Sequence, residues 1–87
     1  MTTSVKILYF SWLREKMGRS EETLALPSGV HTPEALMALL AERDERGAVA
    51  FADISFVHIA VDQNYAELDT LIEHAEEIAF FPPVTGG

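Results

Sequence analysis

The chain has 87 residues, no cysteine and a formal net charge of −8, and residues 47–87 carry seven acidic residues without a lysine or arginine. Hydrophobic residues make up 48% of the chain and charged residues 23%, a composition that predicts one folded domain. The lack of cysteine excludes disulfides and thiol nucleophiles, and it fits a cytoplasmic protein. With no cluster of cations and no apolar run long enough to cross a bilayer, the sequence argues against nucleic acid and membranes and favours a basic protein surface as partner.

The first part of the chain predicts a strand, a short helix and a second strand. Val5–Phe10 combines β-branched and aromatic residues, which is typical of a strand. Ser11 stands where its side chain can cap a short helix that runs through Met17 and stops at Gly18. Thr23–Leu26 is expected to form a shorter strand, which the following Pro-Ser-Gly turn ends.

A longer helix is predicted to begin after Thr32. Thr32 can cap it, Pro33 suits the first helical position, and Glu34 faces the positive end of the helix. Leucines at positions 36, 39 and 40 give the apolar stripe of a core-facing helix, which we expect to end near Gly47. Residues 48–55 give no clear pattern.

The rest of the chain predicts three more strands. Phe56–Val61 forms one, a turn at residues 62–64 leads to a short return strand at Tyr65–Leu68, and Glu77–Phe81 forms the last, which Pro82 and Pro83 halt. Strands around one main helix predict an α+β fold. The β-grasp arrangement of ubiquitin-like proteins matches this order, and that analogy places the first and last strands together in the centre of the sheet. We expect a β-grasp domain over residues 1–82 and a tail over residues 83–87.

Strand alternation predicts an apolar patch on the outside of this sheet. Lys6 and Glu77 should each point to water, and side chains two residues apart share a face. The outer face would then hold Leu8, Phe10, Ala79 and Phe81, and the inner face Val5, Ile7, Tyr9, Ile78 and Phe80. Small soluble proteins seldom leave such a patch bare, so we interpret it as an interface unless residues 48–55 fold over it.

The C-terminus carries the sharpest signal, because residues 80–87 read Phe-Phe-Pro-Pro-Val-Thr-Gly-Gly. A proline pair favours extended backbone and cannot donate to a strand ladder, so the chain should leave the sheet stiffly at Pro82. Val84, Thr85, Gly86 and Gly87 could then reach about 13–14 Å at ~3.3–3.6 Å per residue. Glycines can thread a narrow channel and deliver the terminal carboxylate. A frayed terminus is the alternative, but it would not need aromatic and proline anchors.

Four segments of the sequence resemble one family. Residues 5–18, 32–36 and 60–63, and above all the last nine residues, Ala79–Gly87, look like the small, sulfur-carrying subunits of molybdopterin synthase. The resemblance covers nearly the whole chain. Two departures stand out: Asp62 occupies a position that is usually Asn, and His74–Glu77 replaces a usual Gly-Asp-Glu turn.

The resemblance implies a sulfur carrier in molybdenum cofactor biosynthesis that is not an enzyme by itself. An ATP-dependent enzyme related to ubiquitin-activating enzymes would adenylate Gly87, which is then converted to a thiocarboxylate. The tail would enter the active site of the large subunit, in an expected heterotetramer, and its sulfur would pass to cyclic pyranopterin monophosphate. Together with the outer face, the resemblance assigns partner binding to five residues: Leu8, Phe10, Arg14, Phe81 and Pro82.

Other functions stay open beside this one. A thiazole-pathway sulfur carrier shares the fold and the Gly-Gly end, a ubiquitin-like modifier would be joined to lysines, and a plain binding module would use the apolar patch and ignore the tail. The acidic half could also serve solubility alone. No cofactor is expected, and His31, His58 and His74 are too widely spaced for a metal motif. We interpret Glu21–Glu22 and Glu76–Glu77 as solvated strand ends and not as acid–base pairs.

Overall fold

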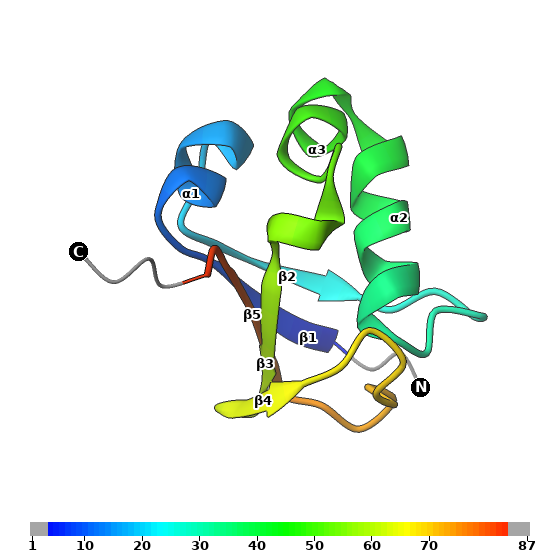
Figure 1. Cartoon of the computed structure of the whole chain (residues 1–87). Helices are drawn as coiled ribbons and strands as arrows, with labels where there is room; N and C mark the ends of the chain where they lie inside the picture. Colours follow the sequence, from blue (N-terminus) through cyan, green and yellow to red (C-terminus); the bar gives the residue numbers. More distant parts are fainter. Residues whose placement is uncertain (1–3, 84–87) are drawn as a thin grey trace.

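A five-stranded sheet with helices on one face forms the body of the protein (Figure 1). The computed structural model describes residues 4–83, so the predicted tail residues Val84, Thr85, Gly86 and Gly87 lie outside the described part. No helix within residues 4–83 is long and apolar enough to cross a membrane. The elements are β1 (Ser4–Tyr9), α1 (Trp12–Met17), β2 (Glu21–Ala25), α2 (Pro33–Arg43), α3 (Glu45–Ala50), the 3₁₀ helix η1 (Ile54–Phe56), β3 (His58–Val61), β4 (Asn64–Ala66) and β5 (Glu77–Phe81).

The strand order is β2-β1-β5-β3-β4, with β1 and β5 parallel at the centre and the other neighbours antiparallel. This arrangement confirms the predicted β-grasp fold, including the central pairing of the first and last strands. In the β1–β5 register Leu8 lies opposite Ala79, and in the β3–β5 register Ala60 lies opposite Ala79. Three strands therefore present these side chains on the same outer face.

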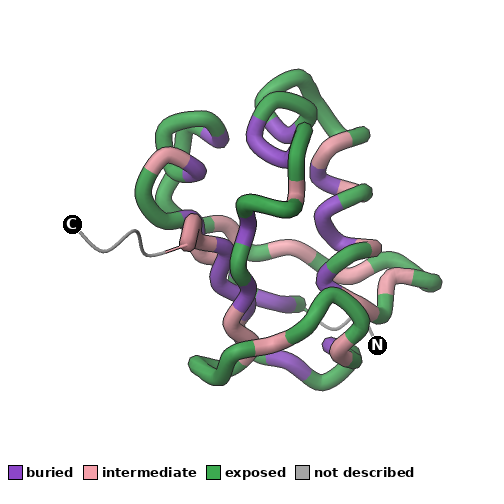
Figure 2. Tube along the Cα trace, in the orientation of Figure 1, coloured by how far each residue is buried: buried purple, intermediate pink, exposed green. Residues whose placement is uncertain are grey.

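The core lies between the inner face of the sheet and the helices. Its strand residues are the ones that alternation placed inside, and Val5, Ile7, Tyr9, Ile78 and Phe80 are all at most 1% exposed. In Figure 2 the buried segments gather on the central strands and on the helices above them. The ring of Phe80 lies 6.3 Å from that of Tyr9 and 5.3 Å from that of Phe51, between centroids. Alternation alone thus identified which side of β1 and β5 is the core.

The end of the main helix was predicted wrongly. Helix α2 stops at Arg43, and Asp44 accepts a hydrogen bond from the backbone N–H of Gly47 at 2.8 Å, which begins the separate helix α3. Gly47 lies inside α3, where a Cβ atom would stand 1.8 Å from the carbonyl oxygen of Leu40. The glycine is therefore required for the close approach of α3 to α2 and is not a stop signal.

Other boundaries also differ from the prediction. Residues 48–55 contain the end of α3 and the start of η1, and Phe56 lies in η1, so β3 begins only at His58. The return strand covers Asn64–Ala66, and the second strand begins earlier, at Glu21. Ser11 occupies the N-cap position of α1, but its side chain makes no capping hydrogen bond.

The turn between β3 and β4 is a two-residue hairpin. Asp62 and Gln63 both have positive φ, 50° and 70°, as a type I′ turn requires. One carboxylate oxygen of Asp62, Oδ1, accepts hydrogen bonds from the backbone N–H groups of Glu76 and Glu77 at 3.0 and 2.9 Å. The two departures from the family pattern therefore meet in space, where the Asp62 carboxylate holds the start of β5.

Candidate interaction surface

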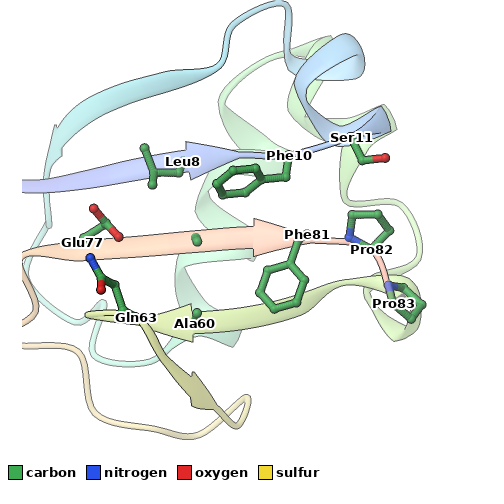
Figure 3. A pocket seen from close by; sticks show the side chains of 10 residues that line it. Leu8, Phe10, Ser11, Ala60, Gln63, Glu77, Phe81, Pro82 and Pro83 are labelled. Carbon is green, nitrogen blue, oxygen red and sulfur yellow. The ribbon is translucent and has the colours of Figure 1, made fainter. Parts of the chain in front are cut away.

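A shallow apolar groove of about 630 Å³ runs along the outer face of the sheet (Figure 3). It follows β5, with β1 on one side and β3 on the other. Alanines form its floor, and aromatic rings and prolines stand at one end. Its lining consists of Leu8, Phe10, Ser11, Ala60, Gln63, Glu77, Ala79, Phe81, Pro82 and Pro83.

The four residues that alternation placed outside all line this groove. Phe10 is 47% exposed, Leu8 and Phe81 are half-buried, and Ala79 is only 7% exposed because larger neighbours flank it. The alternative prediction, that residues 48–55 cover the patch, is wrong, since none of them lines the groove and α3 packs against α1 and α2. The predicted patch is therefore a real and open surface.

Tyr65 extends this surface and was missed from the sequence. It is 79% exposed, and its ring packs edge-on against Phe81 with centroids 5.9 Å apart. His58 lies on the other side of Phe81 at the same 5.9 Å. His58 is exposed on β3, but only the pairing of Ala60 with Tyr65 brings β4 onto the face. That pairing depends on the hairpin register, which the sequence pattern alone does not fix.

The backbone at Ser11 sets the end of the groove where β1 turns into α1. Ser11 has φ 58° and ψ −134°, a region that residues with side chains seldom adopt. Phe10 is held on both sides of this turn, because its N–H donates to Phe80 and its carbonyl oxygen accepts from the N–H of Leu13. Arg14 follows on α1; it is exposed and forms no ion pair within residues 4–83.

Glu22 is not a solvated strand end, contrary to the prediction. Its carboxylate accepts hydrogen bonds from the Tyr9 hydroxyl at 2.6 Å and from two nitrogens of Arg43 at 2.7 and 3.0 Å, and Arg19 adds a contact at 3.2 Å. Burial acts to raise the pKa of Glu22, but the hydrogen bonds from Arg43 and Tyr9 outweigh it and lower that pKa. Burial raises the pKa of the Tyr9 hydroxyl, and the hydrogen bond to Glu22 raises this pKa further.

This network fixes β1 and β2 to the end of α2 and lies outside the groove. No local sequence pattern predicts this network, because Arg43 is 21 residues from Glu22 and 34 from Tyr9. Within residues 4–83 the structure groups no three His, Asp or Glu side chains that could hold a metal ion. His31 lies 3.8 Å from one carboxylate, that of Glu73, while His58 lies in the aromatic cluster.

Comparisons with known proteins agree on one group. The model of the ThiS family matches residues 7–87. A protein of Mycosarcoma maydis named molybdopterin synthase sulfur carrier subunit is 38% identical over 99% of this chain and 96% of its own length. The protein of the same name in Escherichia coli is 36% identical over 95% of this chain and 99% of its own.

Solved structures show the same fold. A putative molybdopterin converting factor, subunit 1, from Pyrococcus furiosus superimposes with a TM-score of 0.74 at 28% identity, over 95% of this chain and all of its own. The small archaeal modifier protein 1 of Methanosarcina acetivorans gives a TM-score of 0.67 at 26% identity, over 100% of this chain and 99% of its own. This chain therefore shares the ubiquitin-like fold of both structures.

Proposed function

Because the chain belongs to the ThiS family, among the sulfur carrier subunits of molybdopterin synthase, we propose that it carries sulfur on the carboxyl group of Gly87. The match to the family model extends to this last residue. A chain without cysteine cannot hold a persulfide, so an activated carboxyl terminus is the sulfur handle that remains.

The loading chemistry needs an activating enzyme. A bare carboxylate is a poor electrophile, so its oxygen first attacks the α-phosphorus of ATP and expels pyrophosphate. The terminal sulfur of a persulfide donor then attacks the carbonyl carbon of the acyl-adenylate and AMP leaves, which gives an acyl disulfide. A thiol next attacks the donor's sulfur, forms a disulfide with it and releases the thiocarboxylate. An ATP-dependent enzyme related to ubiquitin-activating enzymes would perform the first step.

The sulfur carrier subunit works with a large subunit, and we place the reacting site on that partner. The tail would enter that site and pass its sulfur to cyclic pyranopterin monophosphate, within a heterotetramer. The present chain supplies a co-substrate and no catalytic group of its own. A cytoplasmic location, expected from the cysteine-free sequence, stays a prediction.

The observation that carries this proposal is the open groove beside the base of the tail. Pro82 and Pro83 line the groove, so a partner docked there holds the point from which the tail extends (Figure 3). We assign docking to Leu8, Phe10 and Phe81, with Pro82 at the tail's base and Arg14 as a charged contact beside the groove. The body would span residues 1–82 and the tail residues 83–87. A reach of about 13–14 Å for Val84, Thr85, Gly86 and Gly87 sets how far the partner's reacting centre can lie from Pro83.

Deleting Gly87 tests the carrier role. The truncated chain should lose sulfur transfer to the pterin precursor, because its terminal carbonyl is withdrawn by ~3.5 Å and misplacement by ~1 Å can cost about a hundredfold in rate. Thermal stability and affinity for the large subunit should hardly change. Transfer at the normal rate would refute the assignment of Gly87, and loss of the fold would show that the tail packs on the body.

A second function, protein modification, is favoured by one observation: the likeness to the M. acetivorans modifier protein at 26% identity. In that case Gly87 would become joined to lysines of other proteins. A ladder of covalent adducts on a denaturing gel would reveal this use. A thiazole-pathway carrier would instead restore thiazole synthesis, and not molybdopterin, in the matching deletion strain.

A further inference from the structure

Ser11 occupies a turn position that glycine normally fills. The backbone N–H of Leu13 donates to the carbonyl oxygen of Phe10 at 3.2 Å, and Ser11, the first residue inside this turn, has φ 58° and ψ −134°. These angles match the first central position of a type II′ turn, which favours glycine. The chain does place glycine at two other positions of positive φ, Gly18 and Gly29. A side chain at Ser11 therefore raises the free energy of the folded backbone, which glycine would avoid.

Asp62 shows how a side chain can offset such a cost. Its φ is 50°, and its carboxylate accepts hydrogen bonds from two backbone N–H groups at the start of β5. The Ser11 side chain stands at the N-cap position of α1, yet it makes no capping bond and no other hydrogen bond with residues 4–83. Because Ser11 is also exposed, its hydroxyl is available to another molecule.

The Ser11 hydroxyl lies at the end of the groove from which the chain continues into the tail. Figure 3 shows it beside Phe10, at the same end as Pro82. The other residues that line this end carry no polar side-chain atom: Phe10, Phe81, Pro82 and Pro83. The two prolines also lack a backbone N–H that could donate. Among the described lining residues, Ser11 therefore supplies the side-chain donor at the base of the tail.

We propose that the Ser11 hydroxyl donates a hydrogen bond to an acceptor of the large subunit when that partner covers the groove. The inference rests on the proposed function, because it takes the large subunit as the molecule that docks there. A polar contact within an apolar interface fixes orientation, since an acceptor that is buried without its donor costs free energy. The bond would thus set the position of the partner along β5, and with it the point at which the tail enters the partner's site.

Replacing Ser11 with alanine and with glycine separates the hydroxyl from the backbone. Ser11→Ala removes the hydroxyl and keeps the cost of positive φ, whereas Ser11→Gly removes both. Titration calorimetry with the purified large subunit should give a dissociation constant about fivefold higher for each variant. The midpoint of urea unfolding should hardly change for Ser11→Ala and should rise for Ser11→Gly, so that stability and affinity move apart. Ser28→Ala, in the exposed turn before α2 and outside the groove, should change neither.

Asparagine and aspartate at position 11 test the chemistry of the partner's group. Ser11→Asn and Ser11→Asp have the same shape and tolerate positive φ, but only asparagine can donate. In about 1 M salt, which screens charges beyond ~3 Å, Ser11→Asn should bind the large subunit more tightly than Ser11→Asp. Native affinity in Ser11→Ala or Ser11→Gly, or tighter binding by Ser11→Asp, would overturn the proposal.

Phe81→Ala in the same titration keeps this proposal apart from the proposed function. Weaker binding by Phe81→Ala, together with native affinity in the alanine and glycine variants of Ser11, would refute the role of Ser11 alone. Native affinity in all three variants would refute docking at the groove as well. Neither result bears on sulfur transfer by the C-terminus, which the Gly87 deletion tests separately.

Discussion

Replacing Phe80 or Phe81 with alanine should separate folding from docking, because these neighbours lie on opposite faces of β5. Phe80 is fully buried against Tyr9 and Phe51, so its truncation should lower the free energy of unfolding by about 3–5 kcal/mol. For a domain of this length the total is roughly 4–13 kcal/mol, so the loss is a large share of it. Phe81 is half-buried and contacts only the rings of Tyr65 and His58 among the aromatic side chains of residues 4–83. Its truncation should cost the fold about 1 kcal/mol.

Docking should respond in the opposite order. A desolvated aromatic anchor contributes about 2 kcal/mol or more to an interface, so Phe81→Ala should raise the dissociation constant for the large subunit about thirtyfold. Urea unfolding followed by circular dichroism measures stability, and titration calorimetry with the large subunit measures affinity. Leu71→Ala, at an exposed site away from the groove, should change neither. Equal losses of stability for the two phenylalanine variants would show that the assignment of faces is wrong.

Three further outcomes follow from the structure. Gly47→Ala should destabilise the protein by about 1–3 kcal/mol in urea unfolding, because the new Cβ would meet the backbone of Leu40; a neutral effect would refute the close packing of α2 and α3. Glu22→Gln should cost about 1–2 kcal/mol near neutral pH, since Arg43 loses its carboxylate partner. Because the pKa of Glu22 is lower in the folded chain, the stabilisation from its carboxylate is complete above the pKa of the unfolded chain, about 4.3. This stabilisation is lost as the pH falls through the pKa of the folded chain. Below that folded-state pKa the native chain and Glu22→Gln should have the same unfolding curve. Association with the large subunit should slow as salt rises, because steering by the acidic residues 47–87 is screened beyond ~8–10 Å; a rate indifferent to salt would leave this charge as a solubility feature.

The two faces of the sheet could be predicted from the sequence, because one charged residue that points to water determines which side chains of its strand point to the core. Lys6 and Glu77 assigned both faces of β1 and β5 correctly, and the structure places the four outer residues in one groove. The fold followed from element order and analogy, since the pairing of β1 with β5 joins residues some 70 positions apart. No local periodicity contains that information.

The errors have a common physical origin in contacts between distant segments. Gly47 looks like a helix stop in the sequence, but it serves the approach of one helix to another. Glu22 looks solvated until Arg43 and Tyr9 are brought to it by the packing of α2 on the sheet. Tyr65 joins the outer face only through the hairpin register. Local sequence patterns predict which face of a strand is buried and which residue caps a helix. The roles of Gly47, Glu22 and Tyr65 depend instead on which helices and strands pack together.

The most direct test of the carrier role is the intact mass of the chain after incubation with ATP, an activating enzyme and a sulfur source. The mass should increase by the replacement of one oxygen by one sulfur, and fragmentation should assign that gain to Gly87. The change should require ATP, and it should be reversed when the large subunit and cyclic pyranopterin monophosphate are added. An unchanged mass, or a modification assigned to any other residue, would contradict the proposal that the carboxyl terminus carries the sulfur.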